Sequence, residues 1–320
     1  MSLASGMPPN EAPAPLAGIL FGPTASGKTA LAVALAAQLP IEVISADSRQ
    51  VYRHLDIGTA KPTADERRAV AHHLIDFLEL DATYNAARFA AEALEIAAAI
   101  RARGRIPLVV GGAGFYLKVL EEGLFEPPYG AAELAAVRRE LQSWSTDEIR
   151  TALQERDPER AAAIHANDRY RLSRALEICL ASGRSVTSLT AERQRPARHF
   201  VRFRLRIERP TLHRRIATRA RAMLDAGWID EVRARFEAGT PAGAPGLATL
   251  GYPHVVAHIE GRIDRDRLLD LVERDTRRFA RAQETWFRKA RDATPVDFGD
   301  GSGLETIRTA LERAFGTGRS

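Results

Sequence analysis

The segment Gly22-Pro23-Thr24-Ala25-Ser26-Gly27-Lys28-Thr29 constrains the fold of this 320-residue chain more than any other feature. It fits the pattern G-x-x-x-x-G-K-[ST], and it joins the apolar run Leu16–Phe21 to a helical pattern over Lys28–Leu39. The backbone amides of such a loop converge on a phosphate group, and the helix N-terminus adds partial positive charge. Lys28 would bring an ammonium group to the terminal phosphate, and the Thr29 hydroxyl commonly binds Mg²⁺. The sequence therefore predicts a di- or triphosphate site over all eight residues.

Buried-looking strands alternate with helical patterns in the first third of the chain. Ile41–Ala46 and Ile106–Val110 are short apolar runs, and the Ala-rich stretch Ala86–Arg103 between them is typical of a helix. Strand–helix–strand order with continuous apolar strands predicts a parallel α/β sheet. The later elements are a half-buried strand at Val201–Ile207, helices at Thr211–Ala226, Ile229–Glu237 and Arg265–Lys289, a strand at Pro295–Phe298 and a helix at Leu304–Phe315.

From Glu133 to about Leu189 the strands disappear, and apolar residues recur at helical spacing after the Pro127-Pro128 pair. We therefore predict an α/β class with a helical insertion domain. The predicted limits are a tail at 1–15, core at 16–126, insertion at 127–199, core at 200–316 and a tail at 317–320.

Composition excludes several classes of protein. The single cysteine, Cys179, rules out an intramolecular disulfide and a multi-cysteine zinc site. No apolar run reaches the ~18–20 residues of a membrane span, and the first 15 residues lack the basic start and apolar core of a secretory signal. The histidines show no metal-binding spacing. We expect a cytoplasmic protein with no membrane partner.

The net charge is +5, and 42 of the 46 basic residues are arginine. Each retained lysine is therefore a candidate for a role that arginine cannot fill, with base-composition bias as the alternative. The segment Arg274–Arg291 is strongly basic, which suits either a phosphate-backbone contact or a solvated helix face. Trp286 and Phe287 within it are predicted to lie in the core.

Asp47 follows the second predicted strand directly. Since the carboxyl ends of parallel strands face the ligand crevice, its side chain should point toward the phosphate loop. Three interpretations are open: an aspartate that helps to hold Mg²⁺, a general base acting on an incoming nucleophile, or a strand-end residue that caps a helix.

Beyond these features, the chain resembles the tRNA dimethylallyltransferases, also called tRNA isopentenyltransferases. The similar motifs run in the family's order from about Ala17 to Arg291. They are GPTASGKT at 22–29, DSRQVY at 47–52, DIGTAKP at 56–62, HHLID at 72–76, GGAGFYLK at 111–118, NDRYRLSRALE at 167–177, RIATRARAML at 215–224, LGY at 250–252 and TRRFARAQETWFRK at 276–289.

The resemblance implies a P-loop-kinase-like core that binds dimethylallyl diphosphate, and an insertion that binds the anticodon stem-loop of tRNA. The implied reaction attaches a dimethylallyl group to the exocyclic amine of the adenosine just 3′ of the anticodon. With it we expect Mg²⁺ bound at Thr29, and a monomer. Asp47 would be the base, with Thr24, Lys28 and Arg219 also catalytic and Arg219 joining Lys28 at the diphosphate. The implied tRNA contacts are Asp47, Ser48, Arg49, Gln50, Ala113, Tyr170, Arg171, Arg174, Gly251, Tyr252, Arg277, Arg281 and Gln283.

Three positions depart from the family pattern: Ala113 stands where threonine is usual, and Ala135 and Ala282 stand where arginine is usual. Arg138, one turn on, could substitute for the arginine expected at 135. The Ala113 side chain should face the crevice beside Asp47. Three alternatives remain: a P-loop small-molecule kinase, a prenyltransferase of free adenine nucleotides, and an RNA-binding module with a relic phosphate loop. The insertion and the basic helix disfavour the first two, and an intact loop and aspartate disfavour the third.

Overall fold

The computed structural model describes residues 14–125, 128–193, 196–297, 299 and 301–316. Parts of the predictions lie outside these residues. They are 1–13 and 317–320 of the predicted tails, Pro127 of the proline pair, and Phe298 at the end of the predicted closing strand.

Six strands form one sheet within the described residues. They are β1 (Ala17–Phe21), β2 (Ile41–Ala46), β3 (His72–His73), β4 (Ile106–Gly111), β5 (Phe200–Arg206) and β6 (Thr294–Asp297). Their order is β3-β2-β4-β1-β5-β6, and every neighbouring pair is parallel. All residues of β1, β2 and β4 are buried, because helices cover both faces of a parallel sheet. The predicted α/β class with a parallel sheet is confirmed.

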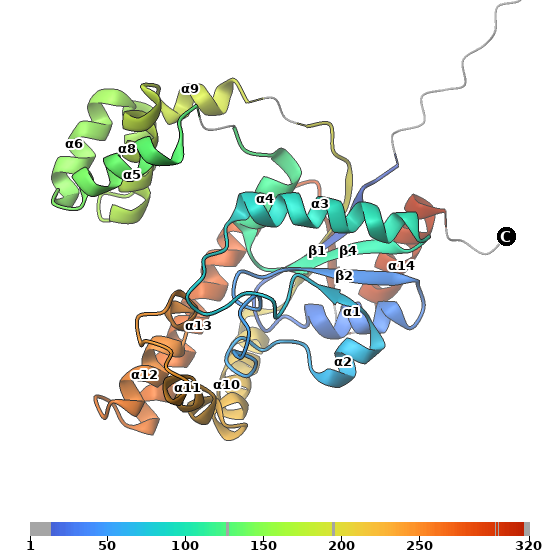
Figure 1. Cartoon of the computed structure of the whole chain (residues 1–320). Helices are drawn as coiled ribbons and strands as arrows, with labels where there is room; N and C mark the ends of the chain where they lie inside the picture. The colour runs from blue at the N-terminus through green and yellow to red at the C-terminus, as the bar shows by residue number, and fades with distance from the viewer. Residues whose placement is uncertain (1–13, 126–127, 194–195, 298, 300, 317–320) are drawn as a thin grey trace, which may run out of the picture. The chain divides into compact units, whose positions relative to one another are not determined.

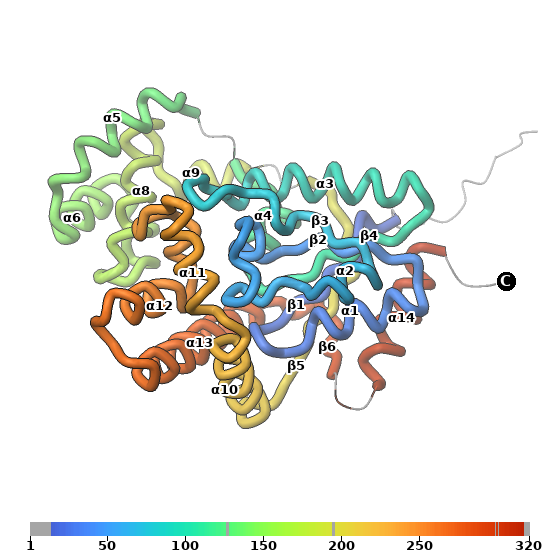
Figure 2. The backbone as a smooth tube through the Cα atoms, turned by 60° about the horizontal axis from the view of Figure 1, so that its bottom comes forward, coloured from blue at the N-terminus to red at the C-terminus, as the bar shows by residue number. Residues whose placement is uncertain are grey.

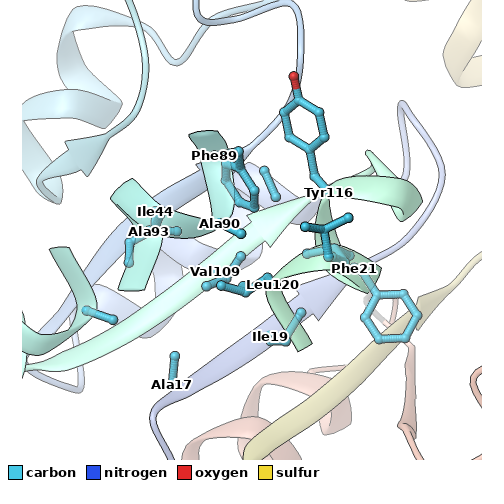
Figure 3. Close-up of a cluster of buried hydrophobic side chains, with 14 of the residues drawn as sticks. Ala17, Ile19, Phe21, Ile44, Phe89, Ala90, Ala93, Val109, Tyr116 and Leu120 are labelled. Carbon is cyan, nitrogen blue, oxygen red and sulfur yellow. The ribbon is translucent and has the colours of Figure 1, made fainter. Parts of the chain in front are cut away.

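Helices lie on both faces of this sheet, as Figure 1 shows. On one face α3 (Ala86–Ala102) and α4 (Gly114–Glu122) pack against it, and on the other α1 (Lys28–Ala36) and α14 (Ser302–Phe315) do so, with α2 (Ala64–Ala69) beside α1. Figure 3 shows the first face, where Ile19 and Phe21 of β1 meet Phe89 of α3 and Leu120 of α4. Leu20, the alternate residue of β1, packs on the opposite face with Leu31 and Phe203. Alternate residues of one strand thus serve two cores.

A group of helices follows β5 in the same compact unit. It comprises α10 (Arg209–Asp225), α11 (Trp228–Glu237), the 3₁₀ turn η1 (Pro245–Ala248), α12 (Tyr252–Ile259) and α13 (Arg265–Phe287). Their shared core includes Leu224, Trp228, Tyr252 and Val272. Figure 2 shows these helices beside the sheet, with α10 in yellow and α11, α12 and α13 in orange. Among the described residues, no helix combines the length and the apolar composition that crossing a membrane requires.

Residues 122–196 form a second compact unit. The sequence predicts this insertion at 127–199, so the unit begins and ends somewhat earlier than predicted. It contains α5 (Ala131–Leu141), α6 (Thr146–Arg156), α7 (Pro158–Ala163), α8 (Arg169–Ser182) and α9 (Val186–Ala191). Ile149, Leu153, Leu172 and Leu176 are fully buried in its core, beside the buried thiol of Cys179. The unit therefore has a hydrophobic core of its own.

The structure differs from the sequence predictions at a few elements. Strand β3 and helix α4 were not predicted; β3 is too short to leave a pattern, and its His73 bonds to Glu42 through Nε2 at 2.7 Å. The prediction that Trp286 lies in the core is wrong: Phe287 is buried, but Trp286 is 39% exposed. Successive residues of an α-helix point about 100° apart, so only one of the two aromatic rings faces the core.

Because β2 and β4 approach closely at Gly111, we predict that a side chain at this position destabilises the fold. A methyl group there would lie 2.1 Å from the Ala46 carbonyl oxygen, its partner across the ladder. We expect Gly111→Ala to lower the free energy of unfolding by about 1–3 kcal/mol through overpacking. Gly243→Ala is the matched control, since a Cβ there meets nothing within 4 Å. Thermal melts that give both variants the same Tm would contradict this reading of the ladder.

Candidate active site

The carboxyl ends of three neighbouring strands, β2, β4 and β1, open on one cavity of about 570 Å³. Its wall is built from the phosphate loop after β1, the segment after β2, Gly112 after β4, a loop before α2, and helices α10 and α13. The polar residues of this wall include Thr24, Lys28, Thr29, Asp47, Arg49, Gln50, Thr59, Lys61, Glu66, Arg215, Arg219, Thr276 and Gln283. The prediction that Asp47 lies beside the phosphate loop is therefore confirmed.

The phosphate loop has the tight backbone that its sequence predicts. Ala25 and Gly27 have left-handed φ angles of 61° and 104°, and glycine adopts this region without the strain of a side chain. A Cβ at Gly22 would lie 2.9 Å from the Leu205 carbonyl oxygen, so β5 requires glycine there. Helix α1 begins at Lys28, and its first amides have no partner within the helix. The loop thus presents donors to an anion.

The side chains of the loop fit the same ligand. The Lys28 ammonium donates to the carbonyl oxygens of Gly22 and Pro23 at 3.0 and 2.7 Å, which holds it against the loop. The Ser26 hydroxyl is buried and has no hydrogen-bond partner in the described part of the chain. A buried hydroxyl without a partner is costly unless a ligand satisfies it. An anion in the loop would be such a partner.

Three charged groups interact across the cavity. Burial lowers the pKa of Lys28 to about 8, the Asp47 carboxylate opposes this effect, and the Arg219 guanidinium adds to it. Burial also lowers the pKa of Arg219, again opposed by Asp47. Within the described residues Arg219 forms no hydrogen bond or ion pair, so its donors are available. The two cations and one carboxylate leave net positive charge for an anionic ligand.

The segment after β2 orients side chains around Asp47. The Arg49 amide donates to Asp47 Oδ1 at 2.9 Å, and the Arg49 guanidinium lies 4.0 Å from the Phe279 ring centroid. Gln50 is held at both ends of its carboxamide: Oε1 accepts from Ser45 Oγ at 3.1 Å, and Nε2 donates to the Ala60 carbonyl oxygen at 3.0 Å. These contacts fix the carboxamide beside Asp47.

Helices α10 and α13 brace the phosphate loop from the other side. Gln283 of α13 accepts from the Thr24 amide at 2.8 Å and donates to the Gly112 carbonyl oxygen at 2.9 Å, so it joins the loop to the end of β4. Arg215 of α10 donates to the Ser26 carbonyl oxygen at 2.9 Å. Gln283 thus binds the Thr24 amide and Arg215 binds a carbonyl oxygen, so both side chains hold the loop in place.

The predicted site residues fall into three groups. Those lining the cavity are Thr24, Ala25, Gly27, Lys28, Thr29, Asp47, Arg49, Gln50, Arg219 and Gln283, with Gly22, Pro23 and Ser26 in the loop behind them. Those of the same unit that lie outside the lining are Ser48, Ala113, Gly251, Tyr252, Arg277 and Arg281. Tyr170, Arg171 and Arg174 belong to α8 of the second unit.

The residues outside the lining have identifiable surroundings. Ala113 packs against the core cluster of α3 and α4 and donates its amide to the Ala46 carbonyl oxygen at 3.2 Å. Tyr252 is fully buried, and its hydroxyl donates to Glu231 at 2.6 Å. Arg277 pairs with Glu273 at 3.0 Å, whereas Arg281 is exposed. Ala113 and Tyr252 therefore contact the protein rather than the cavity.

Sequence reasoning did not identify Arg215, Phe279 or the 58–61 loop as parts of this wall. Arg215 and Arg219 are spaced four residues apart on α10, so helical periodicity places them on one face. That spacing was the available signal for Arg215. Phe279 and the 58–61 loop carry no such local signal, because their role depends on contacts between distant segments.

A parallel sheet with a phosphate loop at its carboxyl edge, and a carboxylate beside that loop, defines an α/β protein built to bind a phosphorylated substrate. Comparison with known proteins identifies the family. The IPP transferase family profile matches residues 50–290. A relative named tRNA dimethylallyltransferase 1, from Citrifermentans bemidjiense, is 42% identical over 86% of this chain and 89% of its own. The chain belongs to the IPP transferase family.

Solved structures agree with this assignment. A tRNA isopentenylpyrophosphate transferase from Bacillus halodurans is 32% identical, with a TM-score of 0.68 over 93% of this chain and 96% of that one. A eukaryotic dimethylallyltransferase described as acting on tRNA shares the fold, with a TM-score of 0.80 at 24% identity over 95% of this chain and 80% of that one.

The lowered pKa of Lys28 gives a prediction for pH dependence. An anion binds the protonated amine, so the contribution of Lys28 to pyrophosphate affinity is full below pH 8 and declines as the pH rises above it. We expect the ratio of wild-type to Lys28→Met affinity, measured by calorimetry, to fall from about pH 7 to about pH 10. The ratio cancels the titration of pyrophosphate itself. A ratio independent of pH would contradict the assignment.

Proposed function

We propose that this protein transfers a dimethylallyl group from dimethylallyl diphosphate to the exocyclic amine of the adenosine immediately 3′ of the anticodon in tRNA. The observation that carries the proposal is the placement of Asp47 in one cavity with Lys28 and Arg219. A carboxylate there can accept a proton while the two cations hold a departing diphosphate. Membership of the IPP transferase family supports the same reaction.

Asp47 has the chemistry of the general base. The adenine amine is a weak nucleophile, because its lone pair delocalises into the ring. As the amine nitrogen bonds to the allylic carbon, that carbon's bond to the diphosphate oxygen breaks and the amine proton passes to Asp47. Removal of the proton by a positioned carboxylate typically accelerates such a step by about 10²–10⁴-fold.

The phosphate loop and Arg219 have the chemistry of the diphosphate site. Negative charge develops on the leaving oxygen, and donors fixed where that charge appears stabilise the transition state. Lys28, Arg219, the first amides of α1 and the unpaired Ser26 hydroxyl are such donors. Thr24 lines the same part of the cavity.

Magnesium would be held mainly by the substrate. In the described part of the chain no group of three or more His, Cys, Asp or Glu side chains could hold a metal ion. Mg²⁺ usually takes one or two protein ligands, with phosphate oxygens and water completing its shell. The Thr29 hydroxyl, which lines the cavity beside Asp47, fits this arrangement. The ion would neutralise charge on the diphosphate.

The tRNA must present an unstacked base to this cavity, since the amine is inaccessible within a stacked loop. The helical unit offers suitable contacts for the surrounding stem-loop. Tyr170 is 79% exposed at the start of α8. Arg171 beside it is exposed, and among the described residues its one ion pair is with Asp168, at 3.2 Å. Aromatic rings stack on bases, and arginines bind phosphates.

A small-molecule kinase is the alternative, because the same loop binds ATP in other proteins. Ligand stabilisation separates the two, since the melting temperature rises with affinity. We expect dimethylallyl diphosphate with Mg²⁺ to raise the Tm more than ATP with Mg²⁺ at equal concentration. A larger shift with ATP would favour the kinase. Product formation from labelled dimethylallyl diphosphate and unmodified tRNA, with free AMP in parallel, tests the transfer itself.

The role of Asp47 predicts a defect in turnover. Asp47→Asn keeps the shape and can still accept the Arg49 amide, but it cannot take a proton. We expect kcat to fall by about 10²-fold or more, with little change in tRNA affinity. Single-turnover kinetics and filter binding measure the two quantities. Near-normal turnover would remove Asp47 as the base.

If α8 contacts tRNA, substitutions of its exposed residues should weaken tRNA binding. We expect Arg171→Ala to weaken tRNA binding and to reduce the slope of log affinity against log salt by about 1. We expect Tyr170→Ala to weaken binding by about 1–3 kcal/mol with the slope unchanged. Arg150→Ala, an exposed position on α6 outside the predicted contacts, is the control. Unchanged binding in both α8 variants would contradict a tRNA contact there.

A further inference from the structure

The carboxylate of Glu231 holds a loop that the sequence motifs did not connect with it. Glu231 lies in the first turn of α11. Its Oε2 accepts from the backbone amides of Asp56 and Ile57, both at 2.7 Å. Its Oε1 accepts from the Tyr252 hydroxyl at 2.6 Å and lies 3.5 Å from the Gly58 amide. One carboxylate therefore joins α11, α12 and the loop.

The loop also packs tightly on α11. A Cβ at Gly58 would lie 2.0 Å from Trp228 Nε1, so only glycine allows this approach. Residues 56–58 lie outside helices and strands, and their amides have no ladder partner. The Glu231 carboxylate thus accepts from backbone amides that, in a helix or strand, would donate to backbone carbonyl oxygens.

From this anchor the loop continues directly into the cavity wall. Gly58, Thr59, Ala60 and Lys61 line the cavity, and the Ala60 carbonyl oxygen accepts from Gln50 Nε2 at 3.0 Å. Gln50 lines the same wall three residues after Asp47. An amide side chain presents a donor and an acceptor that match the edge of adenine, so its orientation decides what it can recognise.

We propose that Glu231 is a positioning residue for the nucleobase subsite. It fixes the loop from Asp56 to Lys61 against α11, and the Ala60 carbonyl then orients Gln50 toward the base beside Asp47. This inference rests on the proposed function, because it takes the base in the cavity to be the target adenine. Tyr252 contributes by holding the Glu231 carboxylate in place.

The test compares substitutions that remove different parts of this chain of contacts. Glu231→Ala removes all the acceptors. Glu231→Gln keeps one oxygen for the Asp56 and Ile57 amides, and Tyr252→Phe removes only one supporting bond. Asp230→Ala is the matched control, because Asp230 lies in the same helical turn but is exposed and bonds to Arg233.

We expect Glu231→Ala to lower kcat/KM for tRNA by about 10–100-fold, as a misplacement of about 1 Å can. Glu231→Gln should recover most of this loss, and Tyr252→Phe should lose only a few-fold. The thermal shift with dimethylallyl diphosphate should stay as in wild type, because the phosphate loop is untouched. Asp230→Ala should match wild type throughout.

A double-mutant cycle tests whether the effect passes through Gln50. In a Gln50→Ala background, Glu231→Ala should cost far less than it does alone, because coupled residues are not additive. Additive losses, or an equal loss of diphosphate binding, would show a general structural role and overturn the proposal. If Glu231→Ala does not fold, the cycle is measured with Tyr252→Phe in its place, and the same two outcomes support or overturn the proposal.

Amide hydrogen exchange tests whether Glu231 anchors the loop, and it does so independently of the proposed reaction. Exchange at Asp56 and Ile57 should accelerate in Glu231→Ala and stay unchanged in Asp230→Ala, whatever the reaction. Unchanged exchange in Glu231→Ala would overturn the anchor. Failure of the wild-type protein to prenylate tRNA, with the exchange result intact, would instead overturn the proposed function.

Discussion

The parallel pairing of β2, β4 and β1 is the constraint on which the rest of the structure depends. Neighbouring strands lie about 4.8 Å apart, so the segments that follow β2 and β1 begin about 10 Å apart with the end of β4 between them. Asp47 and the phosphate loop begin at these two places. The Gly111-Gly112 pair allows close packing at this place, since a side chain at Gly111 would meet Ala46 and one at Gly112 would meet Gln283. The backbone of the sheet thus sets the separation between a carboxylate and a phosphate site.

The charges of the cavity are unbalanced without a ligand. Among the described residues, the cavity is lined by the cations Lys28, Arg49, Arg215 and Arg219 and by two carboxylates, Asp47 and Glu66. Lys61 also lines it, but its charge is paired with Asp56 and Asp76. Burial is the main cause of the lowered pKa of Lys28, and the nearby Arg219 cation lowers it further. A diphosphate would supply the missing negative charge. Asp47 partly offsets the charge of these cations and lines the same cavity as Lys28 and Arg219.

Local sequence patterns predicted the parts of the fold that depend on local physics. The phosphate loop, the buried strands and Asp47 at the end of β2 follow from glycine placement, apolar runs and strand direction, and the structure confirms all three. The braces around the cavity could not be predicted in this way. Gln283 bonds to Thr24 across 259 residues, and Glu231 bonds to Ile57 across 174, so no spacing within a segment reveals them. Trp286 was misplaced because both aromatic residues were assigned to the core together, although the helix buries Ala280, Gln283 and Phe287 at spacings of three and four residues.

Two of the four lysines, Lys28 and Lys61, lie where a compact ammonium is needed in a chain that otherwise uses arginine. Lys28 fits between two carbonyl oxygens of its own loop, and Lys61 lies buried with its Nζ 2.7 Å from both Asp56 and Asp76. A guanidinium is planar and carries five donors, so it could not occupy either space without leaving donors unpaired. Lys61 holds the far end of the loop whose near end Glu231 anchors, and Gln50 bonds to the carbonyl of Ala60 between them. Fixing a loop at both ends with charged groups leaves its middle little freedom. This part of the cavity wall is thereby fixed in part by Glu231, a side chain that lies outside the cavity lining.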